Sequence, residues 1–173
     1  YGAFATSKLR INEQLTFEVS TRWTQDDKEF EGGLSSGAPS IGSIPFQART
    51  FVNWTYGTSL SWRPQTNLNL YARVATGFRA GGFNRDFGTS TTLPGNPATP
   101  VAYGEEKAEV YELGAKYDHA RWLSLSAALF ASDYTDVLIT DQGVRSAAQG
   151  GGTFNYSDNL GDAEVSGYEI EAN

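Results

Sequence analysis

Hydrophobic and polar residues alternate strictly along several segments, and this period of two predicts β-strands. In residues 52–62, Trp54, Tyr56, Thr58, Leu60 and Trp62 alternate with small polar residues. From Trp54 to Trp62 the chain would rise about 26 Å, which projects to about 20 Å if the strand is tilted by about 40°. Aromatic residues therefore bound an apolar stripe of about the height that an outer-membrane β-barrel presents to lipid.

Four further segments follow the same rule, each with apolar residues on one face. They are residues 14–25, 68–78, 109–117 and 122–134. The opening segment, residues 1–9, shows a weaker pattern. In the closing segment Val165 and Tyr168 fall out of phase, as a β-bulge would cause. The pattern therefore predicts seven strands.

The predicted connections alternate between tight turns and long loops. Asn, Pro and Asp occur in the tight turns, and Gly, Ser, Thr and Pro fill the long loops. Short turns at one end and long loops at the other are typical of outer-membrane barrels, whose turns lie in the periplasm. The turns are residues 10–13, 64–67 and 118–121, and the loops are about 26–48, 79–104 and 141–154.

Composition and charge exclude several classes of protein. No stretch approaches the roughly 20 apolar residues of a membrane helix, although barrel strands face lipid on one side only and keep the mean hydropathy low. The net charge is -7 with scattered Lys and Arg, which argues against nucleic acid as a partner. The chain has no Cys, so it has no disulfides or thiolate metal sites. A soluble carbohydrate-binding β-sandwich and a passive porin-like barrel remain the alternatives.

One stretch, YARVATGFRAGGFN at residues 71–84, resembles a barrel-strand signature of TonB-dependent outer-membrane receptors. Three further stretches resemble the same family in the same order, and together the four cover most of the chain outside the long loops. They are YGAFATSKLRINEQLTFEVSTRWTQDDKEF, EKAEVYELGAKYDHARWLSLSAALFASDYTDV and GDAEVSGYEIEAN. The resemblance predicts an all-β, antiparallel, up-and-down barrel segment: about seven strands of a barrel of about 22.

The resemblance also implies a function. Receptors of this family bind a scarce nutrient, most commonly an iron-siderophore complex, and import it across the bacterial outer membrane with energy from the TonB complex. Haem, cobalamin and oligosaccharide are other cargoes of the same scaffold. We expect residues 1–173 to be part of the barrel domain, with the plug domain, the TonB box and the C-terminal strands outside this sequence.

The residues offer little material for catalysis or for a cofactor. His119 is the only histidine, and we interpret it as a solvated turn residue. The carboxylates near the loops, among them Asp133 and Asp141, favour solvation over acid-base chemistry. The glycines at 150–152 precede no Lys-Ser or Lys-Thr, so they are not a phosphate loop. We therefore expect neither an enzyme nor a metal site.

Two sets of residues are candidates for binding. Arg79, Asn84 and Arg85 follow a predicted strand at the outer rim, where arginine suits an anionic chelate. The alternative for Arg79 is that it only shapes the strand end. The predicted lumen wall, which would contact a plug or water, consists of Glu18, Arg22, Asn69, Arg73, Glu112, Lys116, Glu169 and Glu171.

Overall fold

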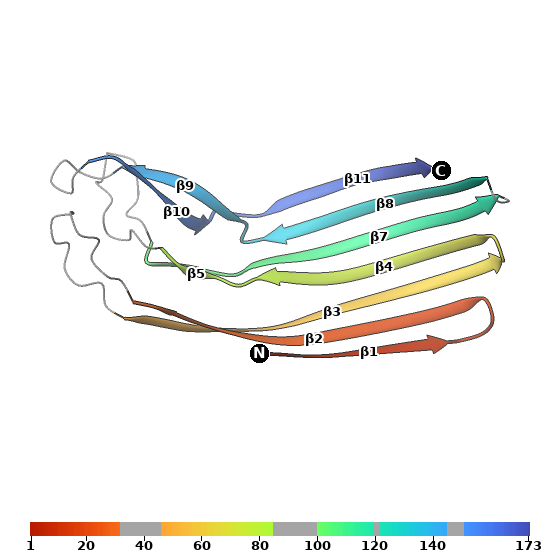
Figure 1. Cartoon of the computed structure of the whole chain (residues 1–173), viewed down its shortest axis with the longest axis horizontal. Helices are drawn as coiled ribbons and strands as arrows, with labels where there is room; N and C mark the ends of the chain where they lie inside the picture. Colours follow the sequence, from red (N-terminus) through yellow and green to blue (C-terminus); the bar gives the residue numbers. More distant parts are fainter. Residues whose placement is uncertain (32–45, 85–99, 120–121, 145–150) are drawn as a thin grey trace.

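Seven antiparallel strands form one sheet in a computed structural model that describes residues 1–31, 46–84, 100–119, 122–144 and 151–173. Apart from short strands in the long connections, neighbours in sequence are neighbours in the sheet (Figure 1). This confirms the predicted up-and-down arrangement. In spatial order the strands are β1 (Gly2–Arg10), β2 (Leu15–Phe30), β3 (Gln47–Gln65), β4 (Leu68–Arg79), β7 (Glu106–His119), β8 (Leu123–Thr135) and β11 (Ala163–Ala172).

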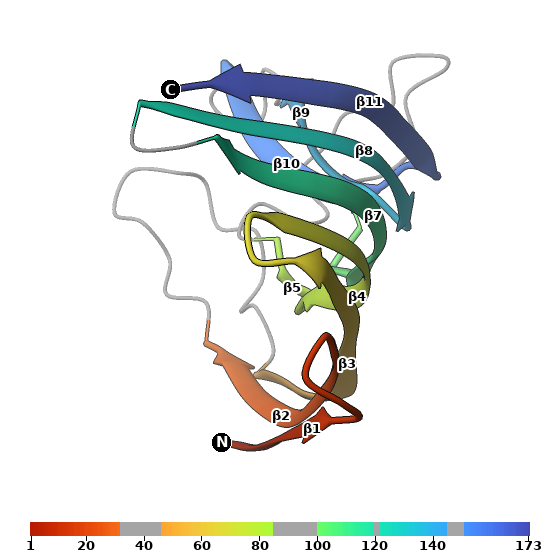
Figure 2. The same cartoon turned by 90° about the vertical axis from the view of Figure 1, so that its right-hand side faces the viewer.

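Large apolar side chains lie exposed on one face of this sheet. Trp54, Leu129 and Tyr168 are 67%, 60% and 74% exposed, although they carry large apolar groups. Next to Trp54, the polar residues on the other face are buried, as Asn53 is, or only partly exposed, as Thr55 is. The sheet curves like a segment of a barrel wall (Figure 2). Such inverted exposure suits a sheet whose apolar face meets lipid instead of a core.

Strand register explains why the apolar residues share a face. Trp23 lies directly opposite Trp54, and Leu15 lies opposite Trp62. In the pair formed by β7 and β8, Leu113 lies opposite Leu129. Residues opposite each other in an antiparallel pair point to the same side of the sheet. Each predicted apolar stripe therefore joins the next across the sheet.

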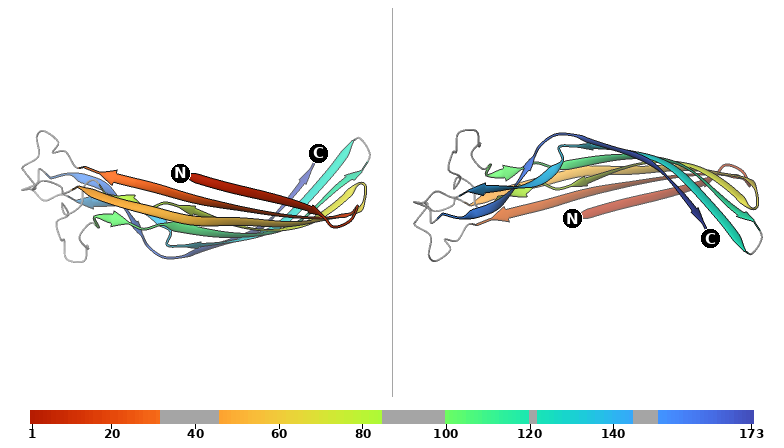
Figure 3. Two further views of the ribbon diagram at one scale, coloured as in Figure 1. Left: turned by 90° about the horizontal axis from the view of Figure 1, so that it is seen from below. Right: turned by 90° about the horizontal axis from the view of Figure 1, so that it is seen from above.

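Turns and long connections lie at opposite ends of the sheet (Figure 3). In the β1–β2 turn, Asn12 Oδ1 accepts hydrogen bonds from the backbone N–H groups of Gln14 and Leu15, at 2.9 and 2.8 Å. An Asn side chain that replaces a backbone acceptor in this way stabilises a tight turn. The predicted separation of short turns from long connections is confirmed.

The long connections contain more strand than the sequence pattern predicts. Of the predicted loop 26–48, residues 26–30 belong to β2 and residues 47–48 to β3, and residues 32–45 lie outside the described part. Among the described residues no helix is long and apolar enough to cross a membrane. The additional short strands are β5 (Gly82–Phe83), β6 (Ala102–Tyr103), β9 (Leu138–Val144) and β10 (Thr153–Asn159).

The bulge predicted in the closing segment is wrong. Strand β11 pairs with β8 without interruption from Ala163 to Ala172, and Val165 lies opposite Ser132 on the polar face. The register shift in the described sheet lies instead between Trp62 and Gln65. Pro64 occupies this stretch, and proline has no N–H to donate to a neighbouring strand.

Candidate functional site

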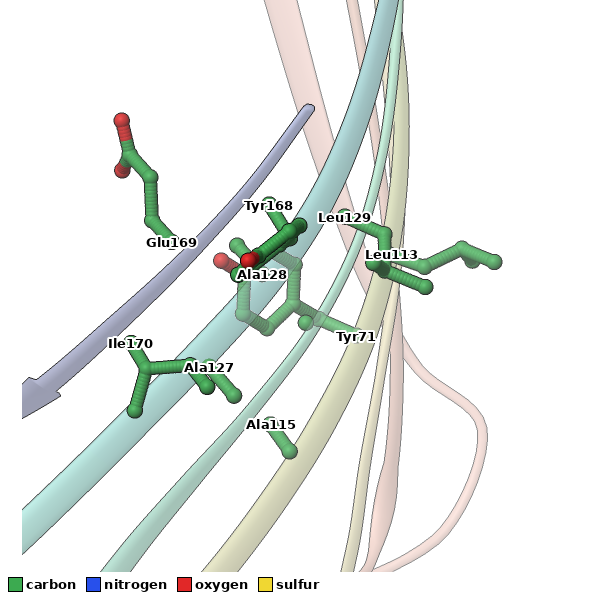
Figure 4. A pocket seen from close by; sticks show the side chains of 10 residues that line it. Tyr71, Leu113, Ala115, Ala127, Ala128, Leu129, Tyr168, Glu169 and Ile170 are labelled. Carbon is green, nitrogen blue, oxygen red and sulfur yellow. The ribbon is translucent and has the colours of Figure 1, made fainter. Parts of the chain in front are cut away.

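The eight residues assigned to the lumen wall all lie on the polar face of the sheet. Arg73 lies opposite Glu112, and Asn69 lies opposite Lys116. Glu169 lies opposite Ala128, on the side of the sheet away from Leu113 and Leu129 (Figure 4). The other members, Glu18, Arg22 and Glu171, follow from the registers of β2 with β3 and of β11 with β8.

Hydrogen bonds organise the middle of this wall around Tyr71. The Tyr71 hydroxyl donates to Glu112 Oε1 at 2.5 Å, and Ser61 Oγ donates to Asn69 Oδ1 at 2.6 Å. Lys116 Nζ lies 6.0 Å from the centre of the Tyr71 ring. These side chains line an open cavity of about 480 Å³. The wall is therefore a preformed polar surface.

Aromatic rings on this wall pack against glycines in the neighbouring strand. Tyr71 lies opposite Gly114, and a Cβ added at Gly114 would lie 2.3 Å from the Tyr71 ring. Phe130 and Gly167 form a second such pair, with 2.8 Å as the corresponding distance. Glycine is thus required where a ring lies flat along the wall.

Strands β3 and β4 separate towards the long-connection end. Their pairing ends at Gly57 and Ala75, although β3 extends back to Gln47. An open cavity of about 380 Å³ follows, and its lining includes Arg49 and Asn159. Two hydrogen bonds span this region. Lys28 Nζ donates to the Gly81 carbonyl at 2.6 Å, and Asn53 Nδ2 donates to Glu105 Oε1.

The three residues that the sequence predicts to contact the ligand differ in their exposure and hydrogen bonding. Arg79 is exposed at the end of β4, opposite Glu106. Asn84 is only 4% exposed: its Nδ2 donates to the carbonyls of Pro100 and Ser157 at 3.0 and 2.7 Å, and its Oδ1 accepts from the Ser157 N–H at 2.8 Å. The Asn84 amide is therefore engaged with the backbone. Arg85 lies outside the described residues.

Two further residues, which the sequence pattern does not mark, organise this end of the sheet. Asn159 Oδ1 accepts from the Gly104 N–H at 2.6 Å, and its Nδ2 donates to the Asp136 carbonyl at 2.7 Å. Glu106 Oε2 accepts from the Leu138 N–H at 2.7 Å. Their partners are 23 to 55 residues away in sequence, so no local pattern reveals them. Together with Asn84, they connect β6, β7, β9 and β10 into one platform.

Two ionisable groups beyond the outer tryptophans have shifted pKa values. Hydrogen bonds from the Thr50 hydroxyl, at 2.7 Å, and from the Gln25 amide lower the pKa of Asp27. Burial raises the pKa of Tyr156, and the nearby Asp141 carboxylate raises it further. The Tyr156 hydroxyl donates to Asp141 Oδ2 at 3.2 Å, which fixes the ring of a residue within the β9–β10 hairpin.

At the turn end, His119 is the last residue of β7 and belongs to an aromatic cluster. Its ring stacks on Tyr117 with centroids 6.0 Å apart and meets the edge of Trp122 at 5.6 Å. The cluster continues the lipid-facing stripe, as aromatic residues at a membrane interface do. Within the described segments, no three His, Asp or Glu side chains converge as ligands for a metal ion.

An exposed apolar face, a polar opposite face and aromatic residues at both ends of the stripe define the wall of a transmembrane β-barrel. Residues 1–173 match the family described as "TonB dependent receptor-like, beta-barrel", and the chain belongs to this family. Barrels of this family lie in the bacterial outer membrane, and its members are transporters and not enzymes.

Two solved structures share the fold at low sequence identity. The ferric yersiniabactin uptake receptor FyuA from Yersinia pestis matches 99% of this chain with a TM-score of 0.70 and 20% identity, over 23% of its own chain. The ferric-catecholate import receptor Fiu from E. coli K12 matches 99% of this chain with a TM-score of 0.67 and 21% identity, over 24% of its own chain.

A curated relative matches part of the chain. The hemoglobin-haptoglobin utilization protein B of Neisseria meningitidis serogroup C is 29% identical over 73 residues, which is 42% of this chain and 8% of that protein. The chain thus spans about a quarter of the solved receptors and a much smaller share of this relative.

Proposed function

We propose that this chain forms part of the barrel of an outer-membrane receptor that binds an iron-siderophore complex and imports it with energy from TonB. The observation that carries the proposal is the two-faced sheet: lipid-facing tryptophans on one side, and on the other a hydrogen-bonded polar wall below a platform of ordered connections. Family membership and the similarity to the ferric yersiniabactin and ferric-catecholate receptors support the choice of cargo.

Coupling to TonB follows from the family and is part of the proposal. In the full-length receptor, a plug domain would fill the lumen and carry the TonB-contacting segment. The polar wall around Tyr71 and Glu112 suits contact with such a plug, because its hydrogen-bonding groups already point away from lipid. The lipid of the outer membrane would contact the opposite face.

An uptake assay tests this function. The full-length receptor is produced in a bacterium that lacks its own siderophore receptors, and the cells are offered radioactive iron as catecholate, hydroxamate or phenolate siderophore complexes, or as haem. We expect accumulation of one siderophore class, abolished by loss of TonB or of the proton gradient. Entry that continues without TonB and rises in proportion to concentration would instead establish a passive porin-like channel. Accumulation of haem alone would overturn the siderophore assignment.

We propose that Arg79 contacts the cargo together with Arg85, whereas Asn84 acts by holding the platform through its hydrogen bonds to the backbone. The Arg79 guanidinium is exposed at the end of β4 and suits an anionic chelate. Loss of a charged hydrogen bond, as in Arg79→Ala, would weaken binding about ten- to hundredfold. Arg63→Ala, at the turn end of the wall, is the matched control and should leave binding unchanged.

A further inference from the structure

Charged residues on the lumen face are segregated by strand. Strands β1 to β4 place six arginines on this face: Arg10, Arg22, Arg49, Arg63, Arg73 and Arg79. Lys8 and Lys28 lie on the same face. The only carboxylates among the described residues of these four strands on that face are Glu18 and Asp26. This half of the wall is therefore strongly basic.

The other half of the wall has the opposite sign. The lumen face of β7 and β11 carries five carboxylates and one amine among the described residues. The carboxylates belong to Glu106, Glu112, Asp118, Glu169 and Glu171, and the amine belongs to Lys116. The described residues of β8 contribute only Ser, Ala, Phe and Tyr to this face, because Asp133 points outward with Glu109. The sign of the wall thus changes between β4 and β7.

No arginine of the basic half forms an ion pair with a carboxylate within the described part of the chain, although Arg73 and Arg79 lie opposite Glu112 and Glu106. The ion pairs there are Lys8–Glu18, at 3.8 Å, and Lys107–Glu105, at 3.9 Å. Lys28 and Arg49 even lie directly opposite each other, and both approach the buried Phe51 ring, at 5.9 and 5.1 Å from its centre. Like charges in opposed positions destabilise a sheet unless an anion compensates them.

The distribution of these charges favours a large occupant over a small anion. From Arg10, opposite Thr16, to Arg49, opposite Lys28, the basic half extends over twelve residues of β2, or about 40 Å. A small anion binds where several donors converge, and these donors are spread along the lumen. Nor does a small anion complement the acidic half. A folded polypeptide can present one face of each sign, and arginine is the cation best shaped to pair with its carboxylates.

We propose that the plug, which the proposed function places in the lumen, turns an acidic face towards β1–β4 and a basic face towards β7, β8 and β11. The charge boundary between β4 and β7 then fixes the rotation of the plug about the barrel axis. The inference rests on the proposed function, because that function requires a plug. The new statement is the orientation of the plug relative to the strands of the wall.

Carbodiimide cross-linking of the full-length receptor in outer-membrane vesicles tests this orientation. The reagent joins amines to carboxylates in contact and does not couple guanidinium groups. Arg22→Lys and Arg73→Lys keep the charge of the wall while each introduces a reactive amine. Lys116, on the acidic half, and Lys107, on the outer face, are matched native amines. Peptide mass spectrometry identifies the bonds formed.

We expect the amines at positions 22 and 73 to join Asp or Glu residues of the plug, and Lys116 and Lys107 to form no bond to the plug. Bonds from positions 22 and 73 only to barrel carboxylates, or bonds from Lys116 to the plug in equal yield, would overturn the orientation and leave the receptor function intact. A full-length protein with no protease-protected segment in its lumen would overturn both proposals.

Discussion

Asn84 and Ser157 exchange two hydrogen bonds although they are 73 residues apart in the chain. Asn84 Nδ2 donates to the Ser157 carbonyl at 2.7 Å, and the Ser157 N–H donates to Asn84 Oδ1 at 2.8 Å. The side-chain amide thus pairs with β10 as a neighbouring peptide group would. Because Asn84 follows β5, this exchange joins two long connections of the receptor at the end where cargo would arrive.

Replacement of Asn84 by alanine should loosen this platform. The backbone groups of Ser157 would lose their partners while partly buried, at a cost of about 1–3 kcal/mol. Hydrogen exchange of the Ser157 amide in the full-length receptor should accelerate by about ten- to hundredfold. Asn155→Ala, at an exposed position on the same strand, is the control. Equal exchange rates in both variants would show that Asn84 does not anchor β10.

A side chain at Gly114 should disrupt the wall by colliding with Tyr71. Its Cβ would lie 2.3 Å from the ring, so Gly114→Ala should destabilise the barrel by about 1–3 kcal/mol. Combining it with Tyr71→Ala should recover part of that loss, because the ring is then absent. Gly77→Ala, with no atom within 4 Å of its added Cβ, should change little. Thermal unfolding in detergent compares Gly114→Ala, Tyr71→Ala, the double variant and Gly77→Ala with the unchanged receptor. If the losses of stability from Gly114→Ala and Tyr71→Ala simply add in the double variant, the contact is contradicted.

The period-two pattern predicts the membrane-spanning part of the fold because lipid demands an apolar residue at every second position. Trp54 and Leu60 face outward, and Arg73 and Glu112 face inward, as the pattern predicts. The pattern fails beyond the membrane. From Asp26 to Phe30, β2 has charged residues on both faces, since both meet water, and a strand there is indistinguishable from a loop.

The site is less predictable than the wall, because its contacts join distant segments. The position of Asn84 after a barrel strand predicts a ligand contact, but its amide is held by Pro100 and Ser157, which the sequence does not place nearby. Asn159 has no local feature that marks it as a bridge. Val165 suggested a bulge because an apolar residue was not expected on the lumen face, where it lies opposite Ser132.

An arginine at position 74 should be far more costly than one at position 75. Val74 faces lipid opposite Thr58, midway between Trp54 and Trp62, where arginine costs about 2–4 kcal/mol. Ala75 faces the lumen opposite Gly57, so Ala75→Arg should cost less than about 1 kcal/mol. Denaturant unfolding of the full-length receptor from lipid vesicles compares the two variants. A larger loss for Ala75→Arg would reverse the assignment of faces.

Thr50→Val should raise the pKa of Asp27 towards its ordinary value, because the hydrogen bond from Thr50 is the main cause of the lowered pKa. The bonds from Gln25 would keep part of the shift. Because the pKa of Asp27 is lower in the folded than in the unfolded protein, its ionised carboxylate stabilises the fold at pH values above the pKa of the unfolded state. This stabilisation is lost as the pH falls through the pKa of the folded state. Infrared titration of isotope-labelled Asp should show the rise, with Thr55→Val as an unchanged control. An unshifted titration in Thr50→Val would contradict the hydrogen bond.

The central claim is that the chain is a barrel wall with one face in lipid and the other lining a lumen. Spin labels placed singly at positions 52 to 62 of the full-length receptor in bilayers test it most directly. We predict that the even positions are accessible to oxygen, which dissolves in lipid, and that the odd positions are not, with the period of two unbroken between Trp54 and Trp62. Accessibility that does not alternate, or oxygen contact at the odd positions, would contradict the account.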